Sequence, residues 1–480
     1  MNRRNDIIKF ILMHSAVIAI ISLCVRDSSD RADKKYIRAV GRDIAIFSSD
    51  DKDYLFLPGY MDEEKIKKTK GFRKYEPEIV RYTGLPTLYI ETTAGNIEKV
   101  LEDKDYKEPG RISVYDAEGN KEYSGGLEYI KGRGNYSWVS EEWPKKPFTI
   151  VLKKEASLLG QPAGTKFALI ANASDDTLIR NDLARSIQEE LQFKYATRGS
   201  FTGLYIDGEF KGIYYLCAPP DIGKARIDIA TAGSDITGGY LMEREYVDRF
   251  ALEEDKIACP VVTDGEEHFI VHEPDYATQE QLEYLRDYMN KVESAIITPG
   301  GDDEEDARYS EYIDTETFVL AYLTEEIAKN YDAGVSSGFC YKVSDRDGGK
   351  LYCAPGWDFD MTLGSYQDWM GYDSPQGLTR MYPHSDASTW FISLQFKDSF
   401  RDRYTQAYRD NRDAIADILY GKRLEQTREM LAGAYEAEYI RWKTMYDDRG
   451  VIPGSDDAYS HLTDFARERI DFLDLVWSTE

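Results

Sequence analysis

Two aspartates separated by one residue are the side chains best suited to bind a cation. Asp358 and Asp360 lie in the apolar segment PGWDFDMTLG (355–364). In an extended segment they project to the same side, roughly 7 Å apart, while Phe359 points the other way into the core. Neighbouring carboxylates repel each other unless a cation lies between them, and hard oxygen ligands suit Mg²⁺ or Mn²⁺. We therefore predict a metal site; the alternative is a pair of turn aspartates satisfied by backbone N–H groups.

A third acidic side chain follows the end of a helical pattern. The segment EEIAKNYD (325–332) ends an amphipathic stretch, and Asn330 and Asp332 leave the helix together. Catalytic groups on a loop braced by a helix would have this arrangement. The alternative is an ordinary C-terminal cap by Asn330. We expect the acidic side chains at 332, 358 and 360 to converge on one divalent cation.

A glycine-rich segment in the first half of the chain is suited to phosphate. In IKGRGNYSW (130–138), Gly132 and Gly134 would let a backbone approach a phosphate closely, and Lys131 or Arg133 would add charge. A tight turn explains the same glycines and is favoured on this motif alone.

Two adjacent lysines open the next strand-like run. Lys145 and Lys146 precede FTIVL (148–152), and Pro147 keeps Lys146 extended. Neighbouring side chains of an extended segment point to opposite faces, so at most one of these lysines faces a cleft. A lysine on a strand can pair with nucleotide phosphates; the alternative is a pair of solvated lysines at a strand edge.

Two hydrolase patterns fit the chain poorly. The segment GVSSG (334–338) matches G-x-S-x-G around Ser336, with His384 or His461 as the nominal base. That motif requires a strand before the serine and a helix after it, and here the order is reversed. A glycosidase is also disfavoured, because Asp358 and Asp360 would lie on one side of a sugar rather than flank its bond.

Composition excludes further classes. Lys and Arg total 60 against 87 Asp and Glu, which gives a net charge of -27. Nucleic acid is therefore not expected as a partner, because binding it requires a basic face. The chain has five histidines, and their spacing does not suit zinc.

The N-terminus has the pattern of an export signal. Basic residues at 3, 4 and 9 precede an apolar stretch over 10–25. We predict that residues 1–26 are a signal sequence or membrane anchor and that the chain is exported, touching a membrane only through this segment. A buried N-terminal helix is the alternative, and cleavage or lipidation of the segment stays open.

Periodicity divides the remainder into a β-rich part and a helical part. Residues 27–84 are predicted to form a linker and peripheral strands, 85–240 a β-rich N-lobe, and 241–480 a helical C-lobe. Helices are expected at 175–193, 279–297, 315–329, 400–419 and 425–446, and a hairpin turn at Asp207-Gly208. The fold class is α+β, with two lobes and a cleft at their junction.

Two cysteines flank a predicted turn. If the hairpin around DRDGG (345–349) centres on Arg346 and Asp347, then Cys340 and Cys353 face each other across it. A disulfide would form in an oxidising compartment; two half-buried thiols are the alternative.

Several of these segments together resemble the CotH kinase family, named for spore coat protein H. The matching segments run in family order over about 85–400: IKGRGNYSW (130–138), KPFTI (146–150), LLG (158–160), ANASDDTLIRN (171–181), IDGEFKGIY (206–214), GYLME (239–243), NYD (330–332), WDFD (357–360) and LG (363–364). The family is similar to atypical protein kinases. The resemblance implies a two-lobed kinase-like fold that binds ATP and Mg²⁺ and phosphorylates serine in Ser-rich coat or surface proteins, with the spore coat as an alternative location.

The resemblance also implies roles for individual residues. Asp332 matches the catalytic-loop aspartate, and Asp358 and Asp360 match the metal-binding pair. The candidate nucleotide contacts are Lys146 and Arg133 for phosphate and Met242 and Glu243 near the adenine. Protein kinases carry a metal-binding Asn five residues after the catalytic Asp, where this chain has Ser337. An exported structural or adhesion protein with a degenerate site is therefore the competing hypothesis.

Overall fold

The computed structural model describes residues 45–49, 52–58, 78–82, 84–245, 260–298, 307–334, 336–365, 373–379 and 389–477. The predicted leader and His384 lie outside these residues. The chain forms two compact units, and each unit joins segments that are distant in sequence. Unit 1 comprises Met1–Asp176, Ser200–Cys217 and Arg428–Gly454, and unit 2 comprises Thr177–Gly199, Ala218–Thr427 and Ser455–Glu480.

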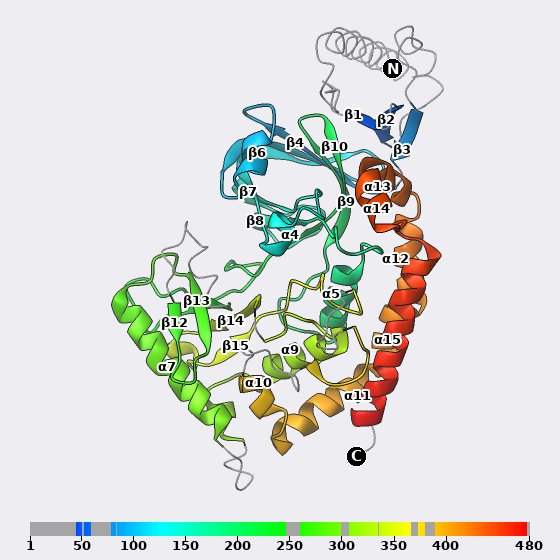
Figure 1. Cartoon of the computed structure of the whole chain (residues 1–480). Coiled ribbons are helices and arrows are strands. Elements are labelled where there is room, and N and C mark those ends of the chain that lie inside the picture. The colour runs from blue at the N-terminus through cyan, green and yellow to red at the C-terminus, as the bar shows by residue number, and fades with distance from the viewer. Residues whose placement is uncertain are drawn as a thin grey trace, which may run out of the picture. The chain divides into compact units, whose positions relative to one another are not determined.

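A closed β-barrel forms the centre of unit 1 (Figure 1). Its strands follow the order β10-β8-β7-β6-β5-β4-β9, and β4 and β9 are parallel neighbours. Alternating apolar residues such as Leu88, Ile112 and Ile150 fill the interior. The strands are β4 (Thr87–Thr92), β5 (Glu108–Tyr115), β6 (Lys121–Gly132), β7 (Phe148–Ala156), β8 (Gly164–Ile170), β9 (Ser200–Ile206) and β10 (Glu209–Cys217).

Smaller elements complete unit 1. A separate sheet has the order β1-β2-β3 (Ala45–Ser49, Lys52–Pro58, Glu78–Tyr82), and the short helices are α3 (Glu98–Glu102), α4 (Tyr136–Val139), α13 (Tyr435–Arg441) and α14 (Lys443–Arg449). The predicted hairpin turn is confirmed: Asp207 and Gly208 have φ of 52° and 82°, which the Asp-Gly pair adopts readily.

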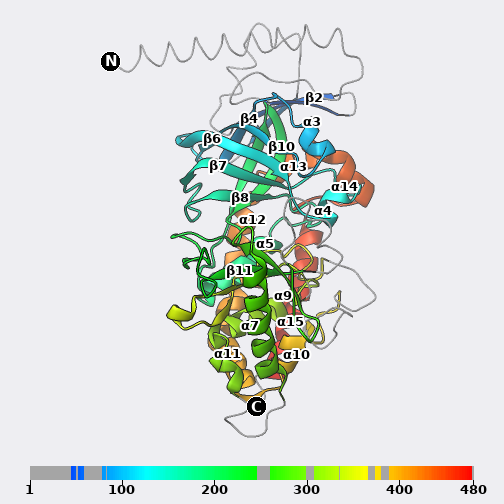
Figure 2. The same cartoon turned by 90° about the vertical axis from the view of Figure 1, so that its left-hand side faces the viewer.

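Unit 2 combines a sheet with long helices (Figure 2). The sheet has the order β12-β13-β11-β14-β15, with β11 (Tyr240–Arg244), β12 (Pro260–Val262), β13 (His268–Glu273), β14 (Gly338–Lys342) and β15 (Leu351–Cys353). The helices are α5 (Arg180–Glu190), α7 (Gln279–Ile297), α9 (Thr315–Ala328), α10 (Thr389–Leu394), α11 (Asp398–Tyr420) and α15 (Asp456–Trp477); α12 (Lys422–Leu431) crosses the boundary between the units. Two 3-10 turns, Arg308–Glu311 and Asp345–Asp347, connect elements of unit 2.

The prediction of a β-rich N-terminal region and a helical C-terminal region is confirmed. The helices predicted at 279–297, 315–329 and 400–419 correspond to α7, α9 and α11. The sequence pattern did not indicate α15, which packs against α11. None of the helices among the described residues is long and apolar enough to cross a membrane.

Two helix predictions were wrong in extent. The helix expected from 175 begins at Arg180, because Leu178 has a φ of 61°, a left-handed conformation that interrupts a helix. The helix expected over 425–446 is three helices, α12, α13 and α14. The break at Trp442 places its indole Nε1 where it donates to the Lys211 carbonyl of β10 at 3.0 Å.

Candidate functional site

In unit 2 the loop after α9 and the loop after β15 lie against each other. The Tyr331 N–H donates to the Met361 carbonyl at 3.2 Å, and the Leu363 N–H donates to the Ala328 carbonyl at 2.8 Å. These backbone bonds connect the segment that carries Asp332 with the segment that carries Asp358 and Asp360. Residues about 30 positions apart in sequence are thereby brought into one site.

Asn330 connects the two loops through its side chain. It is 4% exposed. Its Nδ2 donates to the Glu325 carboxylate at 2.8 Å and to the Asp358 carbonyl at 3.1 Å, and its Oδ1 accepts the Asp332 N–H at 3.2 Å. The side-chain amide of Asn330 therefore hydrogen-bonds to both loops, in addition to its position at the end of α9.

The first turn of α5 holds the loop of Asp358 and Asp360 from another side. Asn181, which is fully buried, accepts the Phe359 N–H at 3.0 Å. Arg180 donates to the carbonyls of Thr362 and Leu363 at 3.1 and 3.3 Å. Both residues belong to the segment DDTLIRN, which sequence comparison singled out without giving it a role.

The burial of Phe359 agrees with the prediction that this side chain points into the core, whereas residues 360–361 form a turn rather than an extended segment. Phe359 is fully buried and packs with Ala184 of α5 and Ala328 of α9. Asp358 and Asp360 on either side of it are half-buried. The buried ring of Phe359 thus anchors the segment, and the carboxylates of Asp358 and Asp360 are not part of this apolar cluster.

The end of the same loop rests on α15. Leu363 and Gly364 have φ of 49° and 75°, and a side chain on Gly364 would collide with the Phe465 ring. His461 Nε2 lies 3.0 Å from the Gly364 carbonyl and donates to it. Ser365 Oγ donates to the Asp360 carbonyl at 2.6 Å. A helix that the sequence pattern did not indicate therefore fixes the exit of the predicted metal-binding segment.

The three aspartates do not form a ready-made metal cage. Among the described residues, no group of three or more His, Cys, Asp or Glu side chains could hold a metal ion. The backbone bonds bring the two segments together, and the convergence of their carboxylates on one cation stays a prediction. Mg²⁺ commonly binds through one or two protein carboxylates with substrate phosphates and waters. The donor set of Asp358 and Asp360 fits that mode.

Ser336 and Ser337 occupy the turn that follows Asp332. The Ser336 N–H donates to the Asp332 carbonyl at 3.2 Å, and the two serine Oγ atoms lie 3.3 Å apart. Ser337 has a φ of 57°. The pattern GVSSG lies between α9 and β14, so its helix-to-strand context is the reverse of a nucleophile elbow, as predicted.

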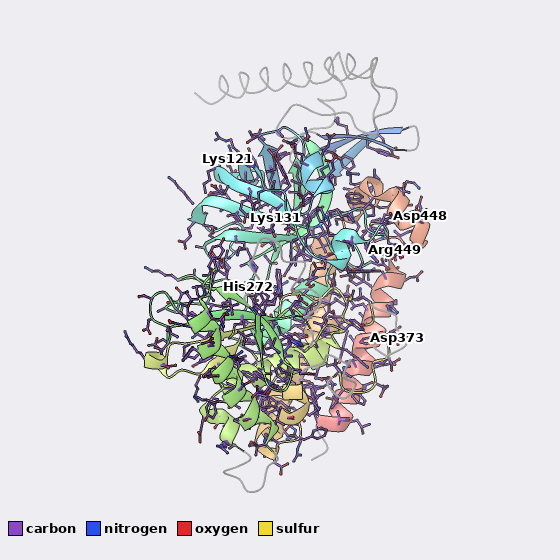
Figure 3. All side chains as sticks on the ribbon, turned by 60° about the vertical axis from the view of Figure 1, so that its left-hand side comes forward. Lys121, Lys131, His272, Asp373, Asp448 and Arg449 are labelled. Carbon is purple, nitrogen blue, oxygen red and sulfur yellow. The ribbon has the colours of Figure 1, made fainter. Side chains whose placement is uncertain are left out.

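Met242 and Glu243 lie on β11, the central strand of the unit 2 sheet. Met242 is fully buried. The Glu243 carboxylate lies 2.6 Å from His272 Nε2, and each side chain is 14% exposed; Figure 3 labels His272. The His272 ring packs on Phe339 at 5.3 Å, and Phe339 meets Trp357 edge-on at 6.0 Å. A series of side-chain contacts through His272 and Phe339 therefore connects Glu243 with Trp357, the residue before Asp358.

The glycine-rich segment lies on the barrel of unit 1. A side chain on Gly132 would collide with the Trp138 ring, and Gly134 has a φ of 77°. Lys131, labelled in Figure 3, pairs with Asp105 at 2.7 Å. Packing and turn geometry therefore account for both glycines, in agreement with the tight-turn interpretation.

The two adjacent lysines have different environments within unit 1. Lys145 is fully buried and pairs with Glu438 of α13 at 2.6 Å. Burial lowers the pKa of the Lys145 ammonium, and the Glu438 charge opposes that shift. The half-buried Lys146 donates to the carbonyls of Trp138 and Ser140 at 2.5 and 2.9 Å, and burial lowers its pKa. The two lysines thus have separate partners; the phosphate role of Lys146 and Arg133 stays a prediction.

The chain belongs to the CotH kinase family: the family model described as CotH kinase protein matches residues 130–473. The match includes the α5 turn, the loop of Asp332 and the loop of Asp358 and Asp360. A comparison with curated proteins finds no match.

Proposed function

We propose that this CotH-family protein is an atypical protein kinase that transfers the γ-phosphate of ATP to serine hydroxyls. One observation carries the proposal: Asn330 and the Tyr331–Met361 backbone bond bring Asp332 beside the segment of Asp358 and Asp360. Kinases need this pairing of a catalytic-loop aspartate with a metal-binding aspartate. A two-lobed kinase-like arrangement is part of the proposal.

In this proposal Asp332 orients the attacking serine hydroxyl and accepts its proton. Asp358 and Asp360 would hold Mg²⁺ or Mn²⁺, with Ser337 as a further oxygen donor. The bound cation would supply charge neutralisation at the β- and γ-phosphates. Lys146 and Arg133 are the proposed phosphate contacts, and Met242 and Glu243 are proposed to lie near the adenine.

The proposed substrate is a Ser-rich coat or surface protein. Family membership links the chain to the spore coat, and the basic and apolar N-terminal segment favours export. Both locations would bring the enzyme to structural proteins rather than to metabolites. Nucleic acid is not proposed as a partner, given the net charge of -27.

A catalytically degenerate scaffold is the second candidate. Two observations favour it: Ser337 stands where kinases have a metal-binding Asn, and the three aspartates form no preformed cage. Calorimetric titration with millimolar ATP and Mg²⁺ separates the candidates. Nucleotide binding that requires Mg²⁺ supports the kinase, and absence of binding supports the scaffold.

Transfer of labelled γ-phosphate to a panel of Ser-rich peptides, with Mg²⁺ and Mn²⁺ compared, tests the activity itself. We expect Asp332→Asn and Asp358→Asn each to lower the rate by about 10²-fold or more, because the proton acceptor or a cation ligand is lost. The matched control is Asp373→Asn, an exposed carboxylate of unit 2 labelled in Figure 3. Labelling by either site variant at the rate of the control would refute the assignment.

A further inference from the structure

Two cysteines of unit 2 lie directly opposite each other in adjacent strands. Cys340 of β14 pairs with Cys353 of β15 in the antiparallel register. The structure records both as thiols. The register confirms that the two residues face each other across the strand pair.

The hydrogen-bond pattern shows which kind of antiparallel pair this is. The Ala354 N–H donates to the Phe339 carbonyl at 2.9 Å, and the Val343 N–H donates to the Lys350 carbonyl at 3.1 Å. Hydrogen-bonded and non-hydrogen-bonded pairs alternate along such a ladder, so Cys340 and Cys353 form a non-hydrogen-bonded pair. Residues in such pairs have Cα atoms about 4.5 Å apart, which lies within the range of about 4.4–6.8 Å that disulfides span.

We propose that Cys340 and Cys353 form a structural disulfide when the chain folds in an oxidising compartment. Each thiol gives up its proton, and the pair gives two electrons to a small disulfide such as oxidised glutathione, which leaves as two thiols. One S–S bond forms in the protein as one S–S bond in the reagent breaks. This proposal does not depend on the kinase activity.

Burial determines when the bond can form and how it persists. Cys340 and Cys353 are 6% and 8% exposed. Burial raises the pKa of the Cys340 thiol to about 12, a shift opposed by the charge of Arg244. The folded thiol therefore has little of the thiolate that attacks a disulfide. Oxidation takes place during folding, before the strands are covered, and the finished bond is shielded from reductants.

The proposed disulfide lies close in sequence to both loops of the candidate site. Cys340 follows Asp332 by eight residues, and Cys353 precedes Asp358 by five. The Cys353 N–H also donates to Thr317 Oγ1 of α9 at 3.2 Å. The disulfide would thus tie together the two strands next to the site loops, at a point already held by α9.

Tryptic mapping tests the proposal directly. The full chain is folded in a glutathione redox buffer, its remaining thiols are blocked with N-ethylmaleimide at acidic pH, and it is digested without reduction. Cleavage after Lys329, Lys342, Lys350 and Arg380 places the two cysteines on different peptides, 330–342 and 351–380. We expect these peptides as one disulfide-linked species. Recovery of both as separately blocked peptides, or linked to Cys24 or Cys259 instead, would overturn the proposal.

Single cysteine variants distinguish the proposed disulfide from a bond formed by misfolding. Cys217→Ala removes a buried cysteine of unit 1 and should leave the linked species unchanged. Cys340→Ala should release 351–380 as a blocked peptide, and Cys353→Ala should do the same for 330–342. In the parent protein, dithiothreitol should separate the linked peptides readily only after denaturant is added. Equally fast reduction of the native protein would contradict the buried bond.

Discussion

The side-chain amide of Asn330 donates to the main-chain carbonyl of Asp358 at 3.1 Å, 28 residues further along the chain. The same side chain accepts the N–H of Asp332 at 3.2 Å. A buried amide with partners on both loops sets their spacing, because each lost bond would leave a buried polar group unsatisfied. Asn330 is therefore the residue whose replacement should disturb both loops together.

Asn330→Asp should reduce phosphate transfer by about 10²-fold, because small displacements of catalytic groups have effects of that size. The new carboxylate would face the Glu325 carboxylate and could not donate to Asp358. Asn411→Asp is the control, since Asn411 also donates its amide to a main-chain carbonyl, on α11. Steady-state transfer rates of the two variants provide the check. Equal rates would show that Asn330 has no positioning role.

Asn181→Leu should lower the free energy of unfolding by about 1–3 kcal/mol, the usual cost of leaving a buried donor unsatisfied. The donor left behind is the Phe359 N–H. Asn290→Leu is the matched control: its side chain also accepts a backbone N–H, that of Asp264, at an exposed site where water can replace it. Denaturant unfolding measures both. A cost for Asn290→Leu as large as that for Asn181→Leu would argue against the loop-anchoring role.

Gly356→Ala should destabilise unit 2 by about 1–3 kcal/mol through overpacking. An added methyl group would lie 2.7 Å from the Phe359 ring and 2.9 Å from the Glu325 carboxylate. At Gly233, also in unit 2, an added methyl group meets nothing within 4 Å. Thermal unfolding should show a lower midpoint for Gly356→Ala than for Gly233→Ala. Similar midpoints would mean that the loop before Asp358 can relax freely.

Lys145→Met should destabilise unit 1 by about 3–5 kcal/mol, because it leaves a buried charge without its partner. That charge is Glu438, and both side chains of the pair are fully buried. Lys443→Met, which removes the solvent-exposed pair with Asp447 in α14, should have a far smaller effect, because water screens exposed charges. Denaturant unfolding of the two variants gives the comparison. A small effect of Lys145→Met would show that Glu438 can reach water or take up a proton.

The pH dependence of stability should include a contribution from Asp345. Burial raises its pKa, but hydrogen bonds from Lys342 and Tyr284 outweigh that effect and hold the pKa below the usual 3.8. The unfolded carboxyl then binds a proton more readily, so this stabilisation is fully present above pH 3.8 and is lost as the pH falls through the lower folded value. Asp345→Asn should narrow the difference in free energy of unfolding between pH 6 and pH 3, by less than about 1 kcal/mol because the Asp345 carboxylate is about half exposed.

The test is to measure the free energy of unfolding at several pH values for three proteins: the parent, Asp345→Asn and Asp373→Asn. Asp373 is exposed and serves as the control. A parent and an Asp345→Asn variant that lose stability in parallel on acidification would contradict the assignment.

Local patterns predicted the site loops well. The burial of Phe359, the helix ending near Asn330 and the Cys340–Cys353 register each depend on a few consecutive residues and on known periodicities. The structure agrees with all three. These are the parts of the fold in which the sequence neighbours of a residue largely decide its environment.

The same local patterns did not predict the contacts between residues that are distant in sequence. The buried pair of Lys145 and Glu438 joins residues 293 positions apart. The contact of His461 with the Gly364 carbonyl spans 97 positions. The residues next to Lys145 or His461 in the sequence do not reveal these contacts. A lysine or a histidine has the same sequence neighbours whether its side chain is exposed to solvent or packs against a distant loop. Both units also join separated chain segments, which periodicity along the sequence does not reveal.

Anomalous diffraction from crystals of the full chain grown with Mn²⁺ and a non-hydrolysable ATP analogue tests the central claim most directly. The claim is that the loops joined by Asn330 form one cation–nucleotide site. The predicted result is an Mn²⁺ peak coordinated by the carboxylates of Asp358 and Asp360, with Asp332 facing the γ-phosphate. An Mn²⁺–nucleotide complex bound elsewhere, or carboxylates of Asp358 and Asp360 turned away from the cation, would contradict it.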